Sequence, residues 1–334
     1  MVFSNLVMQA LQDKTVGQEY VVTALTRAVT LAVAGARRRG GVLGTLLFIG
    51  PASTGKTYMA RNLSRLLTGS ERAIIYFNCQ QLAQGDHLNS LHAQLSAQLQ
   101  PNHIWPSEFR VIVFDEIDKA TPAFHDDLAM AIDCGAITTS EGRFPLQNAF
   151  VILICDLSRK KADQLVGRTI GFFLDGEPAL EMPHRQSVAL EEVDGRLGPR
   201  LVGRLDEIVV FERLTAQNIV TMLERRLCEM EMNLASSCIG FVLQQEAKTF
   251  LLNEGLVDLN HGARQIERVV RNYLEFPLAD LMLSRRLVPG TTVRVGHVQS
   301  NRFLNFDVMI PCFNGAQQFS KAFLIESQSG PSER

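Results

Sequence analysis

The sequence lacks the features that mark several classes of protein. Its six cysteines form no C-x-x-C pair and its seven histidines form no H-x-x-x-H pair, so neither a zinc site nor a disulfide framework is indicated. We expect free, mostly buried thiols. No stretch approaches the roughly 20 apolar residues that a membrane-spanning helix needs, and the N-terminus lacks the basic start and apolar run of a signal peptide. These absences predict a cytoplasmic protein with no membrane partner.

The sequence also lacks an excess of either charge. The formal net charge is −2, which argues against a broadly basic surface built to grip nucleic acid. The basic run Arg37–Arg39 is more typical of a solvated helix end than of a phosphate-backbone contact. With 46% hydrophobic and 20% charged residues, the composition is that of a globular protein. Its 334 residues can form a large domain and a smaller one.

Short apolar runs alternate with helical patterns over most of the chain. The runs are typical of buried parallel strands, and they occupy residues 45–50, 73–78, 111–115, 149–156 and 207–211. The patterns between and before them predict helices at residues 3–12, 18–36, 56–68, 87–99 and 122–133. This alternation predicts an α/β domain whose parallel sheet is covered by helices on both faces.

The pattern changes after Leu214. Helical periodicity follows at residues 215–235, 242–254 and 261–284. Two alternating stretches, TTVRVGHV and FLNFDV, then predict a small antiparallel pair. We therefore expect a large domain over residues 1–212, a small helical domain with a short β element over 213–310, and a flexible polar tail over 311–334.

The strongest motif lies between a predicted strand and a predicted helix. It consists of Gly50, Pro51, Ala52, Ser53, Thr54, Gly55, Lys56 and Thr57. Glycines let the backbone curl so that amide hydrogens point into one concavity at a helix N-terminus, which carries partial positive charge. Lys56 can reach the β- and γ-phosphates of ATP, and the Thr57 hydroxyl can ligate Mg²⁺. The alternative is a glycine-rich turn that binds nothing.

Two carboxylates follow the third predicted strand, in the sequence VIVFDE. Asp115 ends that strand and can hold Mg²⁺, while the adjacent Glu116 can orient and deprotonate an attacking water. The alternative is an acidic strand end that caps the following helix. Together with the phosphate loop, the pair favours nucleotide hydrolysis.

These motifs resemble the AAA+ superfamily, and within it the C-terminal ATPase module of the Clp unfoldases and disaggregases. The resemblance runs over residues 8–308 and rests on five ordered blocks, which read VGQ, FDEIDKA, IDCGAITTSEGRFPLQNAFVILICDLS, RLGPRLVGRLDEIVVFERLT and HGARQIERVVRNYLEFPLADLML. It implies a P-loop AAA+ fold, in which a parallel sheet flanked by helices precedes a small helical lid domain.

The resemblance implies roles for four further residues. Val16 and Gly17 lie where the family frames the adenine. Arg204 matches the arginine finger, which stabilises charge on the γ-phosphate bound by a neighbouring subunit, and Arg264 matches the sensor-2 arginine of the helical domain. Both imply a ring-like homo-oligomer, expected to be a hexamer, that acts on a protein client. The alternatives are a surface arginine paired with Asp206 and an ordinary helix-surface arginine.

The sequence departs from the family pattern at two places. Asp156 stands where the family has the sensor-1 asparagine, and an ionised carboxylate there would repel the γ-phosphate unless protonated, turned away or paired with a cation. We therefore expect slow hydrolysis. The aromatic grip of the family's translocating loop is missing from residues 79–109, as it is in the related torsins, so we do not expect efficient threading of a polypeptide.

One tripeptide, in contrast, matches a feature of the family. Residues 170–172, Ile-Gly-Phe, match a loop that docks on the Clp peptidase in several unfoldases, although apolar loop residues more often cover a core.

Three functions are therefore compatible with the sequence. The leading hypothesis is an ATP-hydrolysing Clp-type AAA+ module that remodels or regulates a protein partner. A nucleic-acid-handling AAA+ loader or regulator is the first alternative, and the charge balance disfavours it. The second is an ATP-dependent scaffold or switch with low turnover, which Asp156 and the missing aromatic grip favour.

Overall fold

The structure is a computed structural model that describes most of the chain in two compact units. The described residues are 2–34, 41–70, 73–82, 91, 109–139, 142–157, 193, 195–257, 262–297, 303–310 and 321–324. One unit comprises Met1–Arg213 and the other Leu214–Arg334. Among the described residues, no helix is both long and apolar enough to cross a membrane.

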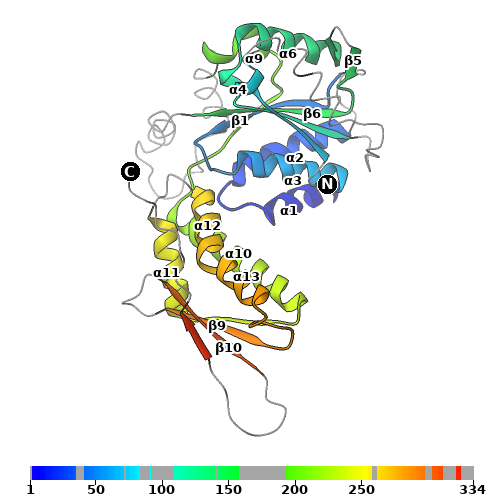
Figure 1. Ribbon diagram of the computed structural model, residues 1–334. Coiled ribbons are helices and arrows are strands. Elements are labelled where there is room, and N and C mark those ends of the chain that lie inside the picture. The colour runs from blue at the N-terminus through cyan, green and yellow to red at the C-terminus, as the bar shows by residue number, and fades with distance from the viewer. Residues whose placement is uncertain are drawn as a thin grey trace, which may run out of the picture. The chain divides into compact units, whose positions relative to one another are not determined.

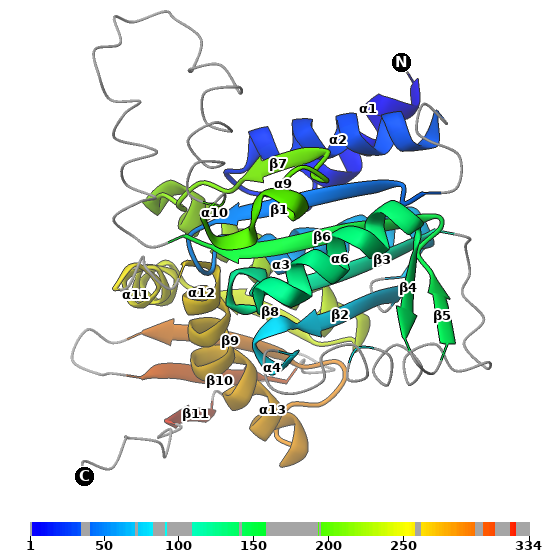
Figure 2. The same cartoon turned by 90° about the horizontal axis from the view of Figure 1, so that it is seen from above.

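A five-stranded parallel sheet forms the centre of the first unit. Its strands are β1 (Gly44–Gly50), β2 (Ile74–Asn78), β3 (Arg110–Asp115), β6 (Ala149–Asp156) and β7 (Glu207–Val210). They lie in the order β2-β3-β6-β1-β7, and every neighbouring pair is parallel (Figure 2). The predicted strands and the α/β class are confirmed.

Helices cover both faces of this sheet. One face carries α1 (Val2–Gln12), α2 (Glu19–Val33) and α3 (Lys56–Thr68), and the other carries α4 (Cys79–Leu82), α6 (Pro122–Cys134) and α9 (Pro199–Val202) (Figure 1). Alternate residues of β1 enter different cores, with Leu46 and Phe48 on one face and Leu47 and Ile49 on the other. A strand buried on both faces must be apolar throughout, which is why it reads as a continuous run.

The ends of α6 follow ordinary capping chemistry. The Thr121 hydroxyl accepts a hydrogen bond from the Phe124 N–H at 3.2 Å, and Pro122 begins the helix where no N–H is needed. Gly135 ends it in the left-handed conformation, with φ of 62°. A hairpin of β4 (Ala136–Thr139) and β5 (Gly142–Pro145) follows, which the sequence patterns did not predict.

The second unit packs helices against a four-stranded sheet. Its helices are α10 (Ala216–Ser236), α11 (Gln245–Leu256), α12 (Gly262–Val270) and α13 (Phe276–Leu283), with a π-helical turn at Arg271–Glu275. Its strands are β8 (Gly240–Leu243), β9 (Thr292–His297), β10 (Leu304–Met309) and β11 (Lys321–Leu324), in the order β11-β10-β9-β8. The predicted antiparallel pair is β9 with β10.

Three expectations for element boundaries differ from the structure. The helix expected from residue 242 begins at Gln245, because β8 occupies residues 240–243 and pairs in parallel with β9. The helix expected over 261–284 is interrupted by the π turn, beside Pro277, whose missing N–H disfavours a regular α-helical interior. Within the expected flexible tail, Lys321–Leu324 form a strand paired with β10.

The exposure of the cysteines differs from what the sequence led us to expect. Cys79 and Cys155 are buried, but Cys134, Cys228 and Cys238 are exposed, so the described thiols are not mostly buried. The exposed three lie at the end of α6, on α10 and in the turn after it.

Candidate functional site

Three chemically important positions meet at one edge of the large sheet. Gly50 ends β1 and is the register partner of Asp156, which ends β6, while Phe114 of β3 is the partner of Leu153 of β6. Asp115, the last residue of β3, therefore lies at the same edge. The carboxyl edge of a parallel sheet is where α/β proteins bind their ligands.

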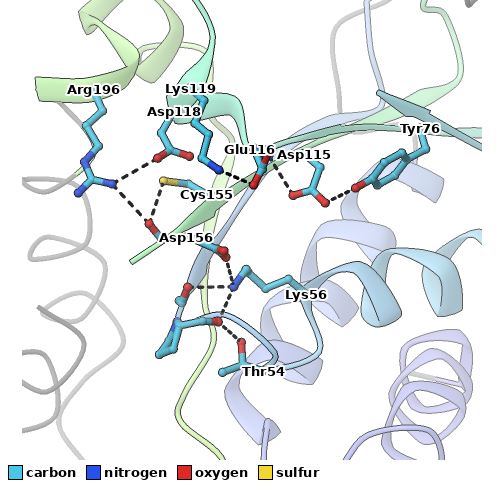
Figure 3. Close-up of polar contacts among 12 residues, drawn as sticks. Thr54, Lys56, Tyr76, Asp115, Glu116, Asp118, Lys119, Cys155, Asp156 and Arg196 are labelled. Carbon is cyan, nitrogen blue, oxygen red and sulfur yellow. Dashed lines mark hydrogen bonds and ion pairs between the residues drawn. The ribbon is translucent and has the colours of Figure 1, made fainter. Parts of the chain in front are cut away.

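The loop from residue 50 to residue 57 curls between β1 and α3. Ser53 and Gly55 both adopt the left-handed conformation, with φ of 63° and 99°. The Thr54 hydroxyl donates a hydrogen bond to the Pro51 carbonyl at 2.9 Å, which closes the curl from within (Figure 3). Helix α3 begins at Lys56, and the first amides of a helix have no partner within it. The loop thus presents N–H groups and a positive dipole end to a ligand.

The two glycines of the loop are needed for different reasons. A Cβ atom at Gly50 would lie 2.5 Å from the Phe211 carbonyl oxygen and 2.8 Å from the Phe211 Cβ. A Cβ atom at Gly55 would meet no atom within 4 Å, but the positive φ there disfavours any other residue. Gly50 is therefore a packing requirement of the sheet, whereas Gly55 shapes the loop.

Lys56 is the buried cation of the site. Its side chain is 5% exposed, and its ammonium donates to the carbonyls of Gly50 at 2.9 Å and Pro51 at 2.5 Å. The Asp156 carboxylate, on a side chain 51% exposed, lies 2.7 Å from the same nitrogen (Figure 3). Burial lowers the pKa of Lys56, and the charge of Asp156 opposes that shift. Asp156 is therefore paired with a cation, which is one of the three states in which it would not repel a γ-phosphate.

Asp115 is held by two donors. The Tyr76 hydroxyl donates to one of its carboxylate oxygens, and the Glu116 N–H donates to the other at 2.9 Å (Figure 3). Burial and the hydrogen bond to Asp115 raise the pKa of Tyr76, so the phenol remains a donor. Sequence reasoning missed Tyr76, because nothing in a strand pattern indicates which carboxylate a half-buried phenol will meet.

Glu116 follows in the left-handed conformation, with φ of 55°. Its side chain makes no capping hydrogen bond to the short helix that follows, so the capping alternative does not hold for this residue. Its carboxylate lies instead 2.5 Å from the Lys119 ammonium. The hydrogen bond that Lys119 donates to Glu116 raises the pKa of Lys119. Glu116 is half-buried at the same edge as Lys56 and can accept a proton there.

The donor set fits a magnesium–nucleotide complex. Mg²⁺ prefers hard oxygen ligands and takes one or two from the protein, with the rest from phosphate and water. Thr57 offers a hydroxyl and Asp115 a carboxylate, next to the Lys56 ammonium and the first amides of α3. Within the described residues, no cluster of three or more His, Cys, Asp or Glu side chains could hold a metal alone.

Val16 and Gly17 lie in the turn between α1 and α2, where Gly17 has φ of 68°. The next residue, Gln18, is buried, and its side-chain amide forms two hydrogen bonds to the backbone of Glu212. Its amide nitrogen donates to the Glu212 carbonyl at 2.8 Å, and its amide oxygen accepts from the Glu212 N–H at 3.0 Å. This clamp ties the expected adenine-framing turn to the end of the large unit.

Arg204 lies between α9 and β7 on a surface turn. Its guanidinium forms an ion pair with Asp133 of α6, and its side chain is 40% exposed. Asp206, the partner suggested by the alternative interpretation, accepts a hydrogen bond from the Thr45 N–H at 2.7 Å. Arg264 is exposed on α12 of the second unit. Among the described contacts of the first unit, none joins Arg204 to Lys56.

Arg196 is a second cation near the site that the sequence did not indicate. It lies 3.5 Å from the Asp118 carboxylate and donates to the Asp156 carbonyl at 3.4 Å (Figure 3). It thereby connects the segment before α9 to the short helix after β3 and to the end of β6. Burial raises the pKa of the Cys155 thiol to about 12, which leaves no reactive thiolate beside these groups.

Three sequence-based expectations lie largely or wholly outside the described residues. The interval that lacks the aromatic grip is described only at residues 79–82, 91 and 109, and the Ile-Gly-Phe tripeptide at 170–172 is not described. The helix expected at 87–99 is described only at Leu91.

Two family models match the chain in the positions of its two units. The model "AAA domain (Cdc48 subfamily)" matches residues 42–208, which contain the loop, Asp115, Asp156 and Arg204. The model "C-terminal, D2-small domain, of ClpB protein" matches residues 214–295, which contain Arg264.

Curated relatives are longer than this chain. It is 27% identical over 299 residues to the chloroplastic chaperone protein ClpD of Arabidopsis thaliana. The matched region covers 85% of this chain and 31% of ClpD. It is 26% identical over 298 residues to the chaperone protein ClpB of Pseudomonas putida, with 85% and 33% covered. The ClpC ATP-binding subunit of the Staphylococcus aureus Clp protease is 26% identical over 303 residues, with 86% and 36% covered. The chain thus spans about a third of each.

A solved structure has the same fold. The S. cerevisiae Hsp104–ADP complex superposes with a TM-score of 0.71 at 23% identity, covering 90% of this chain and 52% of that one. At this identity the likeness concerns the fold alone. Hsp104 in that complex is bound to ADP.

Proposed function

This chain belongs to the AAA family, Cdc48 subfamily, with a ClpB-type small domain after it, and on that premise we propose that it binds ATP with Mg²⁺ and hydrolyses it. One observation carries the proposal. The buried Lys56 ammonium, the Asp115 carboxylate and the N-terminus of α3 lie together at the carboxyl edge of the sheet. A triphosphate and its metal ion need this combination of cation, amides and hard oxygen ligand.

Each side chain has a role in this proposal. Lys56 neutralises phosphate charge, and Thr57 and Asp115 would hold Mg²⁺, which would supply further positive charge to the phosphates. Tyr76 fixes the orientation of Asp115 through its hydroxyl. Glu116 accepts a proton from the water that attacks the γ-phosphorus, and ADP and phosphate are the products. Val16 and Gly17 contact the adenine.

Two arginines extend the site to other parts of an assembly. Arg204 is exposed on a turn, which supports a role in stabilising charge on the γ-phosphate bound by a neighbouring copy in a ring, expected to be a hexamer. Arg264 of the small domain would report on the phosphate state. Chaperones and a protease subunit are among the relatives, which supports a protein client that this module remodels or regulates.

Several features restrict this activity. The aromatic grip is missing from the sequence between β2 and β3, which supports remodelling without efficient threading. Hydrolysis is expected to be slow, because an acid stands at Asp156 where the family has an amide. A cytoplasmic location is part of the same proposal.

A nucleotide-dependent switch with low turnover is the second candidate function. Two ion pairs favour it, since Asp156 is paired with Lys56 and Glu116 with Lys119. Both pairs must be rearranged before these groups can act on a phosphate or a water. A switch would assemble with ATP and turn over little.

Glu116→Gln tests the proposed hydrolysis. The amide cannot accept the proton of the attacking water, so we expect turnover to fall at least about 100-fold while affinity for ATP with Mg²⁺ is retained. Phosphate release and equilibrium nucleotide titration on the full chain measure the two quantities. Particle imaging of the same variant with ATP, with identification of co-purifying proteins, then reports the assembly and the client.

Glu246→Gln is the matched control, because it makes the same change at an exposed position of α11. Equal turnover in Glu116→Gln and wild type would reject Glu116 as the base. Slow wild-type turnover with ATP-dependent assembly would favour the switch. A folded wild-type protein that takes up no adenine nucleotide with Mg²⁺ would end the proposal.

A further inference from the structure

The Lys56 ammonium has no spare hydrogen bond to offer. An ammonium has three N–H donors and no acceptor. In the structure three oxygens surround it, the carbonyls of Gly50 and Pro51 and the carboxylate of Asp156, at 2.9, 2.5 and 2.7 Å. A phosphate oxygen can therefore bind Lys56 only when one of these three acceptors is released.

Two of the three acceptors are fixed in place. The Gly50 carbonyl belongs to β1 and also accepts the Leu157 N–H at 3.0 Å. The Pro51 carbonyl accepts the Thr54 hydroxyl at 2.9 Å within the curled loop. The Asp156 side chain is the exception, because it is 51% exposed and can rotate into solvent. Asp156 is therefore the acceptor that a phosphate displaces.

The identity of the bound phosphate then matters. ATP carries one phosphate group more than ADP, and the lysine of a phosphate loop reaches both the β-phosphate and this additional γ-phosphate. A carboxylate at the end of β6, beside Gly50, repels it whether or not the carboxylate has left Lys56. ADP meets less of this repulsion, because its charge ends at the β-phosphate. A neutral amide at position 156 would remove the difference.

We propose that Asp156 sets the nucleotide preference of this site: it must leave Lys56 when either nucleotide binds, but its charge then repels the γ-phosphate, so that the site favours ADP over ATP. The inference rests on the proposed function, since it concerns the nucleotides of that same site. It assigns Asp156 a role in specificity, and it makes the exchange of ADP for ATP the step at which a partner would act. A merely structural Asp156, bracing the loop against β6, would affect both nucleotides alike.

Equilibrium titration of the full chain with ADP and with a non-hydrolysable ATP analogue, both with Mg²⁺, separates the two roles. We expect Asp156→Asn to raise the ratio of ATP-analogue affinity to ADP affinity by about tenfold, the effect of removing one like charge near a half-exposed site. Asp156→Glu keeps the charge and is expected to keep the wild-type ratio. Asp126→Asn, which removes an exposed carboxylate on α6, is expected to leave both affinities unchanged.

An unchanged ratio in Asp156→Asn, with either affinity altered or not, overturns the inference and leaves the proposed function standing. Failure of the wild type to bind either nucleotide overturns both. If Asp156→Asn does not fold, as judged by thermal unfolding, Asp156→Ser removes the same charge with a smaller side chain and is read in the same way. Rescue of the wild-type ratio by Asp156→Glu, but not by Asp156→Ser, identifies charge as the cause.

Discussion

Lys56 and Arg204 are the two cations expected to act on one triphosphate, and the structure holds them in opposite ways. The Lys56 side chain is 5% exposed and has three oxygen acceptors from its own unit. The Arg204 side chain is 40% exposed, on a turn, with a surface carboxylate as partner. A group that serves its own chain can be fixed before the ligand arrives, whereas a group that serves a neighbouring copy must stay accessible until the copies meet. The exposed fraction of the side chain thus differs between the two cations, although sequence motifs assign both of them to a phosphate.

The largest expected effect is that of replacing the exposed cation, Arg204. Arg204→Ala should lower ATP turnover by about 10³-fold, because an arginine finger supplies that much transition-state stabilisation. Nucleotide affinity of the isolated chain should remain, since Arg204 does not contact the loop of its own copy in the described structure. Arg200→Ala, which removes an exposed arginine from α9 nearby, is the control and should retain turnover.

Mixing variants tests whether Arg204 acts between copies. Glu116→Gln lacks the proposed base and Arg204→Ala lacks the proposed finger, so each alone should show little turnover. In a mixed ring, some sites combine the intact Glu116 of one copy with the intact Arg204 of the next, and part of the activity should return. If mixing restores nothing while both variants still assemble with ATP, the guanidinium does not act in trans.

A smaller effect is expected from Tyr76→Phe, which changes the buried part of the site, around Lys56 and Asp115. Loss of the hydroxyl removes one of the two donors that hold Asp115, and outer-shell partners of a metal ligand are worth about 10- to 100-fold. We expect the Mg²⁺ concentration for half-maximal turnover to rise about tenfold. Tyr58→Phe removes an equivalent hydroxyl from an exposed position on α3 and should change nothing. An unaltered Mg²⁺ dependence in Tyr76→Phe would mean that Asp115 needs no such support.

The smallest expected effect is on stability. Gln18→Ala removes two hydrogen bonds to the Glu212 backbone and leaves buried polar groups without a partner, so the free energy of unfolding should fall by about 1–3 kcal/mol. Gln12→Ala, at an exposed position of α1, should stay within about 0.5 kcal/mol of wild type. Denaturant-induced unfolding measures both. Equal values for the two variants would show that the clamp adds nothing.

Much of the sheet and of the phosphate loop follows from local patterns. A strand buried on both faces is apolar along its length, so β1 and β6 are visible as runs, and the residues after them fall at the carboxyl edge. Lys56 is recognised because the loop, strand and helix are contiguous in sequence. These features depend on neighbouring residues, which a sequence displays directly.

Contacts between distant residues could not be predicted in the same way. The Asp156 partner of Lys56 is 100 positions away in sequence, and the Gln18 clamp on Glu212 spans 194 positions. Sequence reasoning left Asp156 with several possible states and did not identify Gln18 or Tyr76 as contributors. Strand β8 pairs with β9, which is distant in sequence. The β4–β5 hairpin is local but its strands are short, like β8, and short strands carry little periodicity of their own.

Gly50 has a practical consequence for experiments on this chain. Because a side chain there would collide with Phe211, a Gly50→Ala protein would carry a distorted sheet before any nucleotide was added. Its failure to bind would be indistinguishable from misfolding. Lys56 or Gly55 is the better position to substitute in order to remove nucleotide binding. The glycine at position 50 is required by the close packing of the sheet against Phe211 more than by contact with a ligand.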